Sequence, residues 1–280
     1  MKKIERLQEE EYKILKRIDL FCNKHNINYF LYSGTLLGAI RHQGFIPWDD
    51  DIDIAMLRTD FNKFDDLLAK GIFDDEYFYY QSNRVQPFYL SEVVKIRTKT
   101  INVSERVPTT QTGFYGPWVD IFPLDNVPDD QQSREKQFKD IDTINSIIDF
   151  FLRTTEKPHD AGFKRIFRKS VRIVNETLYK GYFFLPYLFR KRYKLITKYN
   201  DVETKAVSSL SYMGFKNYAD YARCIIVKEN LEEFIRIPFK EHNFLAPKEY
   251  HNILKYQYGD YMKEPKAIER EDHRLIFNDE

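Results

Sequence analysis

YFLYSGTLLGAIRHQGFIPWDDDIDIAM, residues 29–56, decides the fold because its periodicity changes twice within one short stretch. The apolar run at 29–32 predicts a strand, and the Ser33-Gly34 dipeptide predicts a tight turn into a helix over 35–42. At 51–56 aspartates first alternate with isoleucines, which is typical of a strand with one polar and one apolar face. The stretch therefore predicts the order strand, turn, helix, strand.

Two acids, Asp51 and Asp53, share one face of the second predicted strand. Side chains two residues apart on a strand lie about 7 Å apart, so like charges there repel each other unless a cation holds them. We therefore interpret the pair as a metal site. Asp49 shares their face and is either a third ligand or a loop acid. An EF-hand is excluded, because counting from Asp49 places Ile54 where glycine is required and Asp60 where glutamate is required.

Other polar positions have two open interpretations each. The Ser33-Gly34 turn is either a plain turn or a phosphate cradle, because a helix N-terminus attracts anions. Asp120 lies in an apolar strand predicted over 118–122, and is either structural or part of the acid site if its strand lies beside 51–56. Lys95 and Arg97 alternate with aliphatic residues and are either phosphate contacts or solvent-facing charges.

The composition is that of a folded chain without a marked overall charge. The 280 residues are 42% hydrophobic and carry a net charge of +1, so the total charge indicates no partner. Cys22 and Cys224 form no close-spaced motif, which argues against a disulfide framework or zinc ribbon and fits a reducing compartment. Glutamates at 5 and 9–11 interrupt any signal peptide, and no run approaches the ~20 apolar residues of a membrane span. We therefore expect a cytoplasmic protein.

The whole chain predicts an α+β fold, a mixed β-sheet flanked by helices. We place a boundary near residue 128, between a catalytic domain (1–128) and a mainly helical second part (129–280) whose C-terminal strands complete the site. Expected helices lie at 4–25, 61–70, 131–154 and 248–258, with two more within 163–200. Expected strands lie at 77–81, 89–98, 101–104, 118–122, 207–213 and 224–227.

Residues 163–194 are basic and aromatic, with Glu176 as the one acid. Such a segment either lies on an anionic membrane surface or forms a helical pair with basic faces packed on the domain. No nucleic-acid recognition module is evident, so we expect no nucleic-acid partner.

Several motifs together resemble one family. SGTLLGAIRHQGFIPWDDDIDI (33–54) is similar to the signature of the LicD family of phosphocholine transferases, to which fukutin-type proteins are related. The resemblance continues in VVKIRTKT (93–100), WVDIFPLDNVP (118–128) and FLAPKEYHNILKYQYGDYMKEP (244–265), but residues 130–205 carry no matching motif. The resemblance implies the nucleotidyltransferase fold of the polymerase-beta superfamily.

The resemblance also implies an activity. It predicts transfer of a phospho-alcohol, usually phosphocholine, from a CDP-linked donor such as CDP-choline to a sugar hydroxyl, with release of CMP. The acceptor would be a surface glycan of the teichoic acid, lipopolysaccharide or capsule type. If the acceptor is lipid-linked, the enzyme must act at the membrane. This favours a protein bound peripherally to the inner face of the membrane, with contact through residues 163–194.

The implied roles fall on residues already singled out. Two Mg²⁺ or Mn²⁺ ions about 3.5–4 Å apart would be bridged by Asp51 and Asp53, with Asp120 completing one site and acting as general base. Ser33 and Gly34 would cradle the donor phosphate. Further candidate phosphate contacts are Arg41, Lys95, Arg97 and His273.

Two other classes of protein stay open. An Asp-x-Asp site also serves glycosyltransferases that use nucleotide sugars, and nucleotidyltransferases that make CDP-alcohols. The short spacing between the turn and the acids favours the nucleotidyltransferase fold over a glycosyltransferase. An inactive protein that keeps the fold only to bind an acceptor is disfavoured by the intact acids, Asp51, Asp53 and Asp120.

Overall fold

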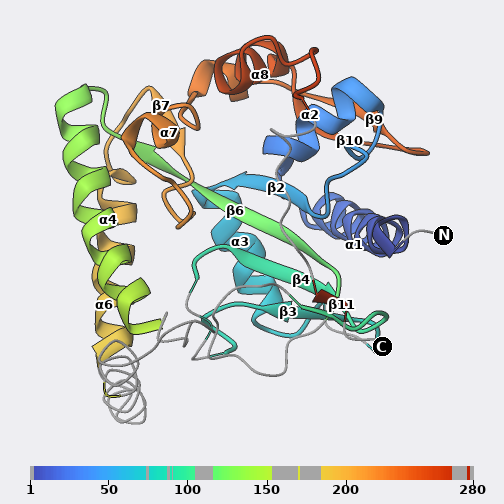
Figure 1. Cartoon of the computed structure of the whole chain (residues 1–280), viewed down its shortest axis with the longest axis horizontal. Coiled ribbons are helices and arrows are strands. Elements are labelled where there is room, and N and C mark those ends of the chain that lie inside the picture. The colour runs from blue at the N-terminus through green and yellow to red at the C-terminus, as the bar shows by residue number, and fades with distance from the viewer. Residues whose placement is uncertain are drawn as a thin grey trace.

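The computed structural model describes residues 3–73, 76–86, 89, 91–104, 116–152, 170, 184–266 and 276–277. Within these residues a mixed sheet of seven strands forms the centre (Figure 1). Its main path runs through β1 (Phe30–Leu31), β2 (Ile52–Leu57), β6 (Trp118–Val127), β4 (Val94–Thr98) and β3 (Phe78–Gln81). β2 and β6 are parallel, and the other pairs are antiparallel. The predicted α+β class is confirmed.

The sheet continues beyond residue 128. β7 (Ala206–Ser208) pairs with the second half of β6, and β8 (Ile226–Val227) pairs with β7. A separate short pair joins β5 (Val103–Ser104) to β11 (Ile276–Phe277).

Three N-terminal helices pack around the sheet. α1 (Lys3–His25) buries an apolar stripe that includes Leu7, Ile14 and Ile18, as its 3.6-residue periodicity predicts. α2 (Ser33–His42) connects β1 to β2, and α3 (Arg58–Leu68) follows β2 directly. α1 contacts β2, β4 and β6, while α3 contacts β2 and β6. Their apolar faces share the largest core cluster with the strands.

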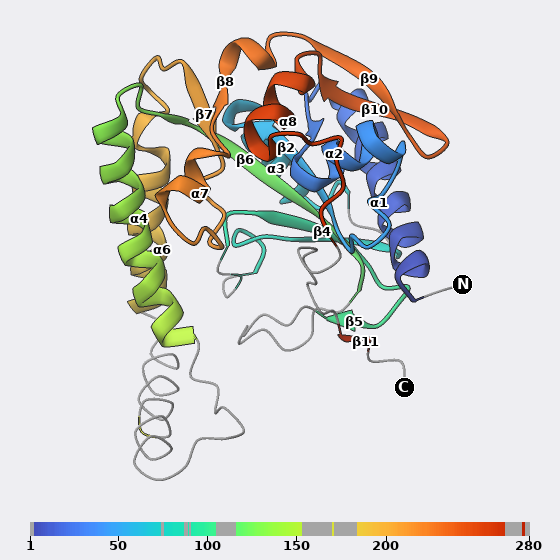
Figure 2. The same ribbon diagram turned by 45° about the horizontal axis from the view of Figure 1, so that its top comes forward.

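Two long helices lie side by side at one edge of the sheet (Figures 1 and 2). α4 (Gln131–Leu152) and α6 (Phe184–Ile196) pack through Ile144 and Ile148 against Leu188 and neighbouring side chains. Arg192 of α6 is fully buried. Its guanidinium forms an ion pair with Glu92 and donates to Asn145 of α4 and to the carbonyl oxygens of Leu210 and Ser211. In the basic segment 163–194, α6 thus packs on the domain, whereas residues 163–183 except Ser170 lie outside the described residues.

A hairpin that the sequence did not predict lies at the opposite end (Figure 2). β9 (Phe234–Phe239) pairs with β10 (His242–Pro247), and Phe239 and Phe244 reach the main core. β9 contains Pro238, and among the described residues it pairs with a strand on one side only, where proline is tolerated. The chain continues into α8 (Tyr250–Tyr258). The remaining short helices are η1 (Thr197–Tyr199), α7 (Tyr218–Ala222) and η2 (Lys228–Leu231).

The C-terminal elements contribute to the same core as the N-terminal ones. Ile237, Ala246, Leu254 and Tyr261 belong to the core cluster that contains the first helices. The boundary near residue 128 stays a prediction. Across the described part of the chain, every helix is too short or too polar to traverse a bilayer.

Candidate active site

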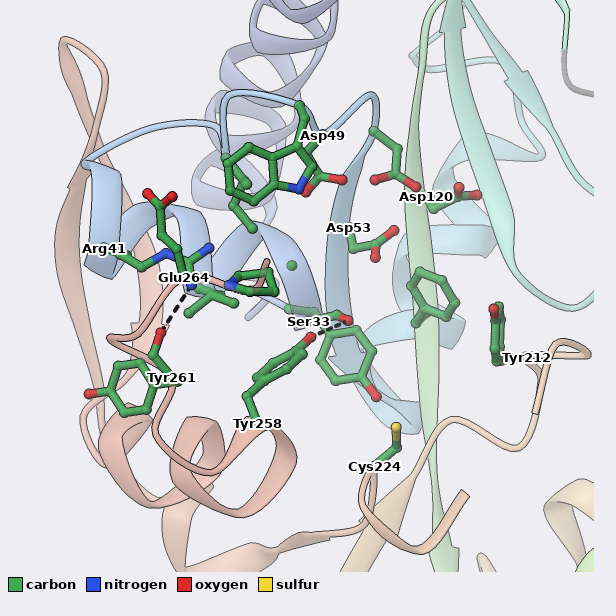
Figure 3. Close-up of a pocket in the computed structure, with 18 of the residues that line it drawn as sticks. Ser33, Arg41, Asp49, Asp53, Asp120, Tyr212, Cys224, Tyr258, Tyr261 and Glu264 are labelled. Atoms are coloured by element: carbon green, nitrogen blue, oxygen red, sulfur yellow. Dashed lines mark hydrogen bonds between the residues drawn. The ribbon is translucent and has the colours of Figure 1, made fainter. Parts of the chain in front are cut away.

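The strand register brings three acids together. β2 and β6 run parallel with Asp53 opposite Asp120, and Asp51 immediately precedes β2. Carboxylate oxygens of Asp51, Asp53 and Asp120 lie within 4.8 Å of one another. Asp49 and Asp50 form a second such group, again with Asp51. Figure 3 shows Asp53 and Asp120 on neighbouring strands at the edge of one pocket.

The acids perturb one another strongly. Burial raises the pKa of Asp53 well above its ordinary value, and the negative charges of Asp51, Asp120 and Asp49 raise it further, while Lys95 acts in the opposite direction. Clustered carboxylates of this kind fit a divalent cation, because Mg²⁺ and Mn²⁺ prefer oxygen ligands and would relieve the repulsion.

Asp120 is held by its neighbours on the sheet. Lys95 lies opposite it on β4 and places Nζ 2.7 Å from Oδ1 and 2.9 Å from Oδ2. The indole Nε1 of Trp118 donates to Oδ2 at 2.9 Å. Lys95 also lies 4.8 Å from the centre of the Trp118 ring. These contacts orient the Asp120 carboxylate and place Lys95 on that carboxylate instead of on the pocket wall.

Arg97 does not line the pocket. Its side chain is buried, and it donates to Gln81 Oε1 at 2.6 Å and to the Gly116 carbonyl oxygen at 2.9 Å. Its guanidinium lies 4.8 Å from the centre of the Trp118 ring. We therefore assign Arg97 a structural role in the sheet, in place of the predicted phosphate contact.

A pocket of about 850 Å³ opens in front of the acids. Of the predicted residues, the pocket is lined by Ser33, Gly34, Arg41, Asp49, Asp51, Asp53 and Asp120. His273 lies outside the described residues. Arg41 is fixed by a hydrogen bond from Nη1 to the Tyr261 carbonyl oxygen at 3.1 Å.

The first turn of α2 is joined to the acid-bearing strand β2. Ser33 has a φ of 48°, a left-handed conformation that starts the helix sharply. Thr35 Oγ1 accepts a hydrogen bond from the backbone N–H of Asp53 at 2.8 Å. A side chain at Gly34 would place its Cβ 3.0 Å from Oδ2 of Asp49, so the glycine permits a close approach of that carboxylate. The predicted phosphate turn and the predicted acids therefore form one unit.

Several pocket residues were not placed in the site from the sequence, although Tyr258 and Tyr261 belong to an aromatic cluster that permits a cage for a quaternary ammonium group without locating one. These are mainly aromatic: Tyr32, Trp48, Phe122, Tyr212, Phe215, Tyr258 and Tyr261, with the charged residues Asp260, Lys263, Glu264 and Lys266. Ser33 Oγ and the Tyr258 hydroxyl share a hydrogen bond of 3.1 Å (Figure 3). The residues that follow α8 fall within the C-terminal motif 244–265, and this motif was the sequence signal that could have placed them in the pocket. No sequence signal marked Tyr212 or Phe215.

Glu11 is a second unpredicted feature. It is fully buried on α1, and in the described part of the chain neither of its carboxylate oxygens has a hydrogen-bond partner. Burial raises the pKa of Glu11 well above its ordinary value, and the charges of Asp51, Asp50 and Asp49 raise it further. The acid site therefore extends its electrostatic influence into the core of the domain.

Comparisons with known proteins agree with this architecture. Residues 26–143 match the family described as LicD/FKTN/FKRP, nucleotidyltransferase domain. The chain is 27% identical over 285 residues, 98% of each protein, to the "Lipopolysaccharide cholinephosphotransferase LicD" of Haemophilus influenzae. An uncharacterized protein of Rickettsia typhi is 47% identical over 59 residues, 21% of this chain and 19% of that protein. One of Rickettsia prowazekii is 51% identical over 49 residues, 18% of each chain. The chain therefore carries a LicD/FKTN/FKRP nucleotidyltransferase domain over residues 26–143, which bears Asp51, Asp53 and Asp120, and it is similar along nearly its whole length to a LicD protein.

Proposed function

We propose that the protein transfers phosphocholine from CDP-choline to a hydroxyl group of a surface glycan and releases CMP. The observation that carries the proposal is the single pocket in which three carboxylates face a helix-starting turn. It is supported by the end-to-end similarity to a bacterial protein named as a lipopolysaccharide cholinephosphotransferase.

Asp51, Asp53 and Asp120 are the residues that would hold Mg²⁺ or Mn²⁺. Asp51 belongs to both groups of three carboxylates, which supports a pair of ions with Asp49 as a further ligand. Bound divalent ions lower the pKa of an attacking hydroxyl and neutralise charge on a leaving phosphate.

The transfer is a displacement at phosphorus. The acceptor oxygen forms a bond to the donor phosphorus that carries choline, and the bond from this phosphorus to the bridging oxygen breaks. The electron pair of the broken bond goes to that oxygen, which leaves as part of CMP. Asp120, held in position by Lys95 and Trp118, is our candidate for the base that takes the hydroxyl proton.

The donor phosphates belong at the first turn of α2. The N–H groups at a helix N-terminus and the helix dipole favour an anion, and Ser33 and Gly34 line the pocket at this point. Arg41, Lys263 and Lys266 add positive charge to the lining.

We further propose that the acceptor is lipid-linked and that the protein works at the inner face of the membrane. Of the basic segment 163–194, α6 exposes Arg190, Lys191 and Lys194, and the aromatic rings of Tyr187 and Tyr193 are also exposed. Cations and aromatic rings on one surface suit an anionic bilayer.

The direct test is product analysis. Purified protein is incubated with Mg²⁺ or Mn²⁺, a glycan acceptor and, in turn, CDP-choline, CDP-ethanolamine, CDP-glycerol or CDP-ribitol. We expect CMP release and a phosphocholine adduct with CDP-choline, both abolished by Asp53→Ala. Release of UDP from a nucleotide sugar would instead support a glycosyltransferase. Formation of a CDP-alcohol from CTP would support a nucleotidyltransferase.

A further inference from the structure

Four aromatic rings form a row at one end of the pocket. The row consists of Tyr32, Phe122, Tyr212 and Phe215, all of which line the pocket. Successive ring centres lie 5.6, 6.4 and 4.9 Å apart, and successive planes are inclined by 48°, 59° and 80°. Because neighbouring rings are inclined, the edge of one ring meets the face of the next, so each pair covers fewer ring faces than a stacked pair would.

The row starts at the reacting groups. Tyr32 directly precedes Ser33 of the predicted phosphate turn. Phe122 follows Asp120 by two residues on β6, so both side chains lie on the same face of the strand. Two residues of a strand cover about 6–7 Å. A short alcohol on a phosphate held at the acids can therefore reach the row.

The two ends of the pocket differ in charge. Among the described residues, the cationic side chains of the lining are Arg41, Lys263 and Lys266, and the lining also includes the acids Asp260 and Glu264. Figure 3 shows Arg41 and Tyr212 at opposite sides, with Asp53 between them. Beside Tyr212 the lining includes Cys224, whose pKa is raised to about 11 by burial, so that its thiol is neutral. Arg41 with Glu264 beside it thus forms a charged end of the pocket (Figure 3), whereas a cationic ligand group near Tyr212 lies away from Arg41, against aromatic rings and a neutral thiol.

Tyr212 is the exposed member of the row. Its side chain is 45% exposed, although it contacts Phe122, which is 8% exposed. Its ring lies where a side chain on Gly214 would be, with Cε1 2.8 Å from that Cβ position. Phe215 supports the ring from the other side and is anchored against Tyr221 at 5.5 Å. Gly214 and Phe215 thus both contact the Tyr212 ring and restrict its position in the pocket lining.

We propose that this aromatic row is the subsite for a quaternary ammonium group and that Tyr212 makes the site prefer it over a primary ammonium. A trimethylammonium group has no N–H to donate and is attracted to ring faces within about 6 Å of their centres. The assignment rests on the proposed function, because it identifies the group as the choline of the donor.

The test compares donors and variants. The donors are CDP-choline, CDP-ethanolamine and the neutral 3,3-dimethylbutyl analogue of CDP-choline. Tyr212→Ala lowers kcat/KM for CDP-choline about 5- to 30-fold, mainly by raising KM. It changes kcat/KM for CDP-ethanolamine less than about twofold. Tyr212→Phe keeps the choline preference, because the ring face remains. Gly214→Ala acts in the same direction as Tyr212→Ala, because the new methyl group displaces the ring. Tyr256→Ala, an exposed tyrosine of α8 outside the pocket lining, leaves both donors unchanged.

A binding measurement separates the two possible failures. Saturation-transfer NMR detects the trimethyl protons of bound CDP-choline. We expect Tyr212→Ala to reduce the saturation-transfer signal of these protons relative to that of the cytidine protons. If the variant and the wild type show equal trimethyl contacts, or if both donors lose activity equally, the subsite assignment is overturned while the transferase function stands. If the wild type neither binds nor turns over CDP-choline, the proposed function fails and the subsite with it.

Discussion

Replacing Asp53 by asparagine tests whether the acid site is built for a cation. Asparagine keeps the size of the side chain and removes its charge. In the metal-free protein the change should raise stability, because Asp53 is buried beside Asp51 and Asp120. With Mg²⁺ present this advantage of the variant should shrink, because the variant has lost a ligand and gains less stability from the ion than the wild type does. Transferase activity should fall to background.

The magnitude follows from the separation of the charges. Two unit charges 4.8 Å apart repel by about 3.5 kcal/mol at an effective dielectric constant near 20. Asp53 has two such neighbours, Asp51 and Asp120, and the opposing charge of Lys95, which affects Asp53 less than either acid does, offsets less than one of them. At a pH above the pKa of folded Asp53 we therefore expect the metal-free variant to be at least about 3.5 kcal/mol more stable than the wild type, a rise in Tm of roughly 7 °C or more for a chain of this size.

The stability that Asp53→Asn gains over the wild type should increase with pH. The pKa of folded Asp53 is raised above the ordinary value of 3.8, so the folded protein keeps this proton to higher pH than the unfolded chain does. The stability of the wild type therefore falls as pH rises from 3.8 to the pKa of the folded state. The advantage of the variant should grow over this range and be absent at lower pH.

Calorimetry with EDTA and with excess Mg²⁺ measures both effects. The wild type should gain about 2.7 kcal/mol when Mg²⁺ is at 100 times its dissociation constant, and Asp53→Asn should gain much less. Asp142→Asn, an exposed acid on α4, serves as the matched control. A variant that is less stable than the wild type in EDTA, and that still gains the full Mg²⁺ shift, would refute the reasoning.

Three further predictions concern other parts of the molecule. Glu11→Gln should raise the Tm of the metal-free protein at pH 8 and leave it unchanged below pH 4.5, the ordinary pKa of glutamate, because the folded protein keeps the Glu11 proton to higher pH than the unfolded chain does. Glu232→Gln is the control, and a lower Tm of Glu11→Gln at pH 8 would contradict this prediction. Arg192→Met should cost about 3–5 kcal/mol in urea unfolding because Glu92 remains buried without its charge partner, and adding Glu92→Leu should recover most of the loss; no recovery would show that the helix packing alone matters. The protein should pellet with anionic vesicles, less so at high salt and in Arg190→Glu; binding that ignores salt or is absent would refute the membrane proposal.

The sequence predicted the elements whose pattern is local. The stretch 29–56 folds as expected, because turn chemistry and side-chain alternation act within a few residues. The meeting of Asp53 and Asp120 was predicted only on condition that their strands were neighbours. That condition depends on the parallel register of β2 and β6, which joins positions far apart in the chain.

Other features depend on contacts that no local pattern contains. The alternation of Lys95 and Arg97 indicated a shared face, but only the strand order shows that the face meets Asp120 and Trp118. Glu11 was hidden in a run of glutamates that reads as a solvated helix surface. Tyr212 belongs to a chain segment between short elements, where aromatic residues are common in cores and no periodicity distinguishes a pocket wall.

Both faces of β6 carry side chains with fixed partners, so the number of residues between those side chains cannot change. Asp120 and Phe122 face the pocket, whereas Asp125, five residues after Asp120, points to the other face and binds Arg58 of α3 and Asn200. Substitutions along the strand change single contacts. An inserted or deleted residue between the two acids would turn one of them to the wrong side and detach either the reactive end or the anchored end. The strand can therefore vary in composition but not in residue count.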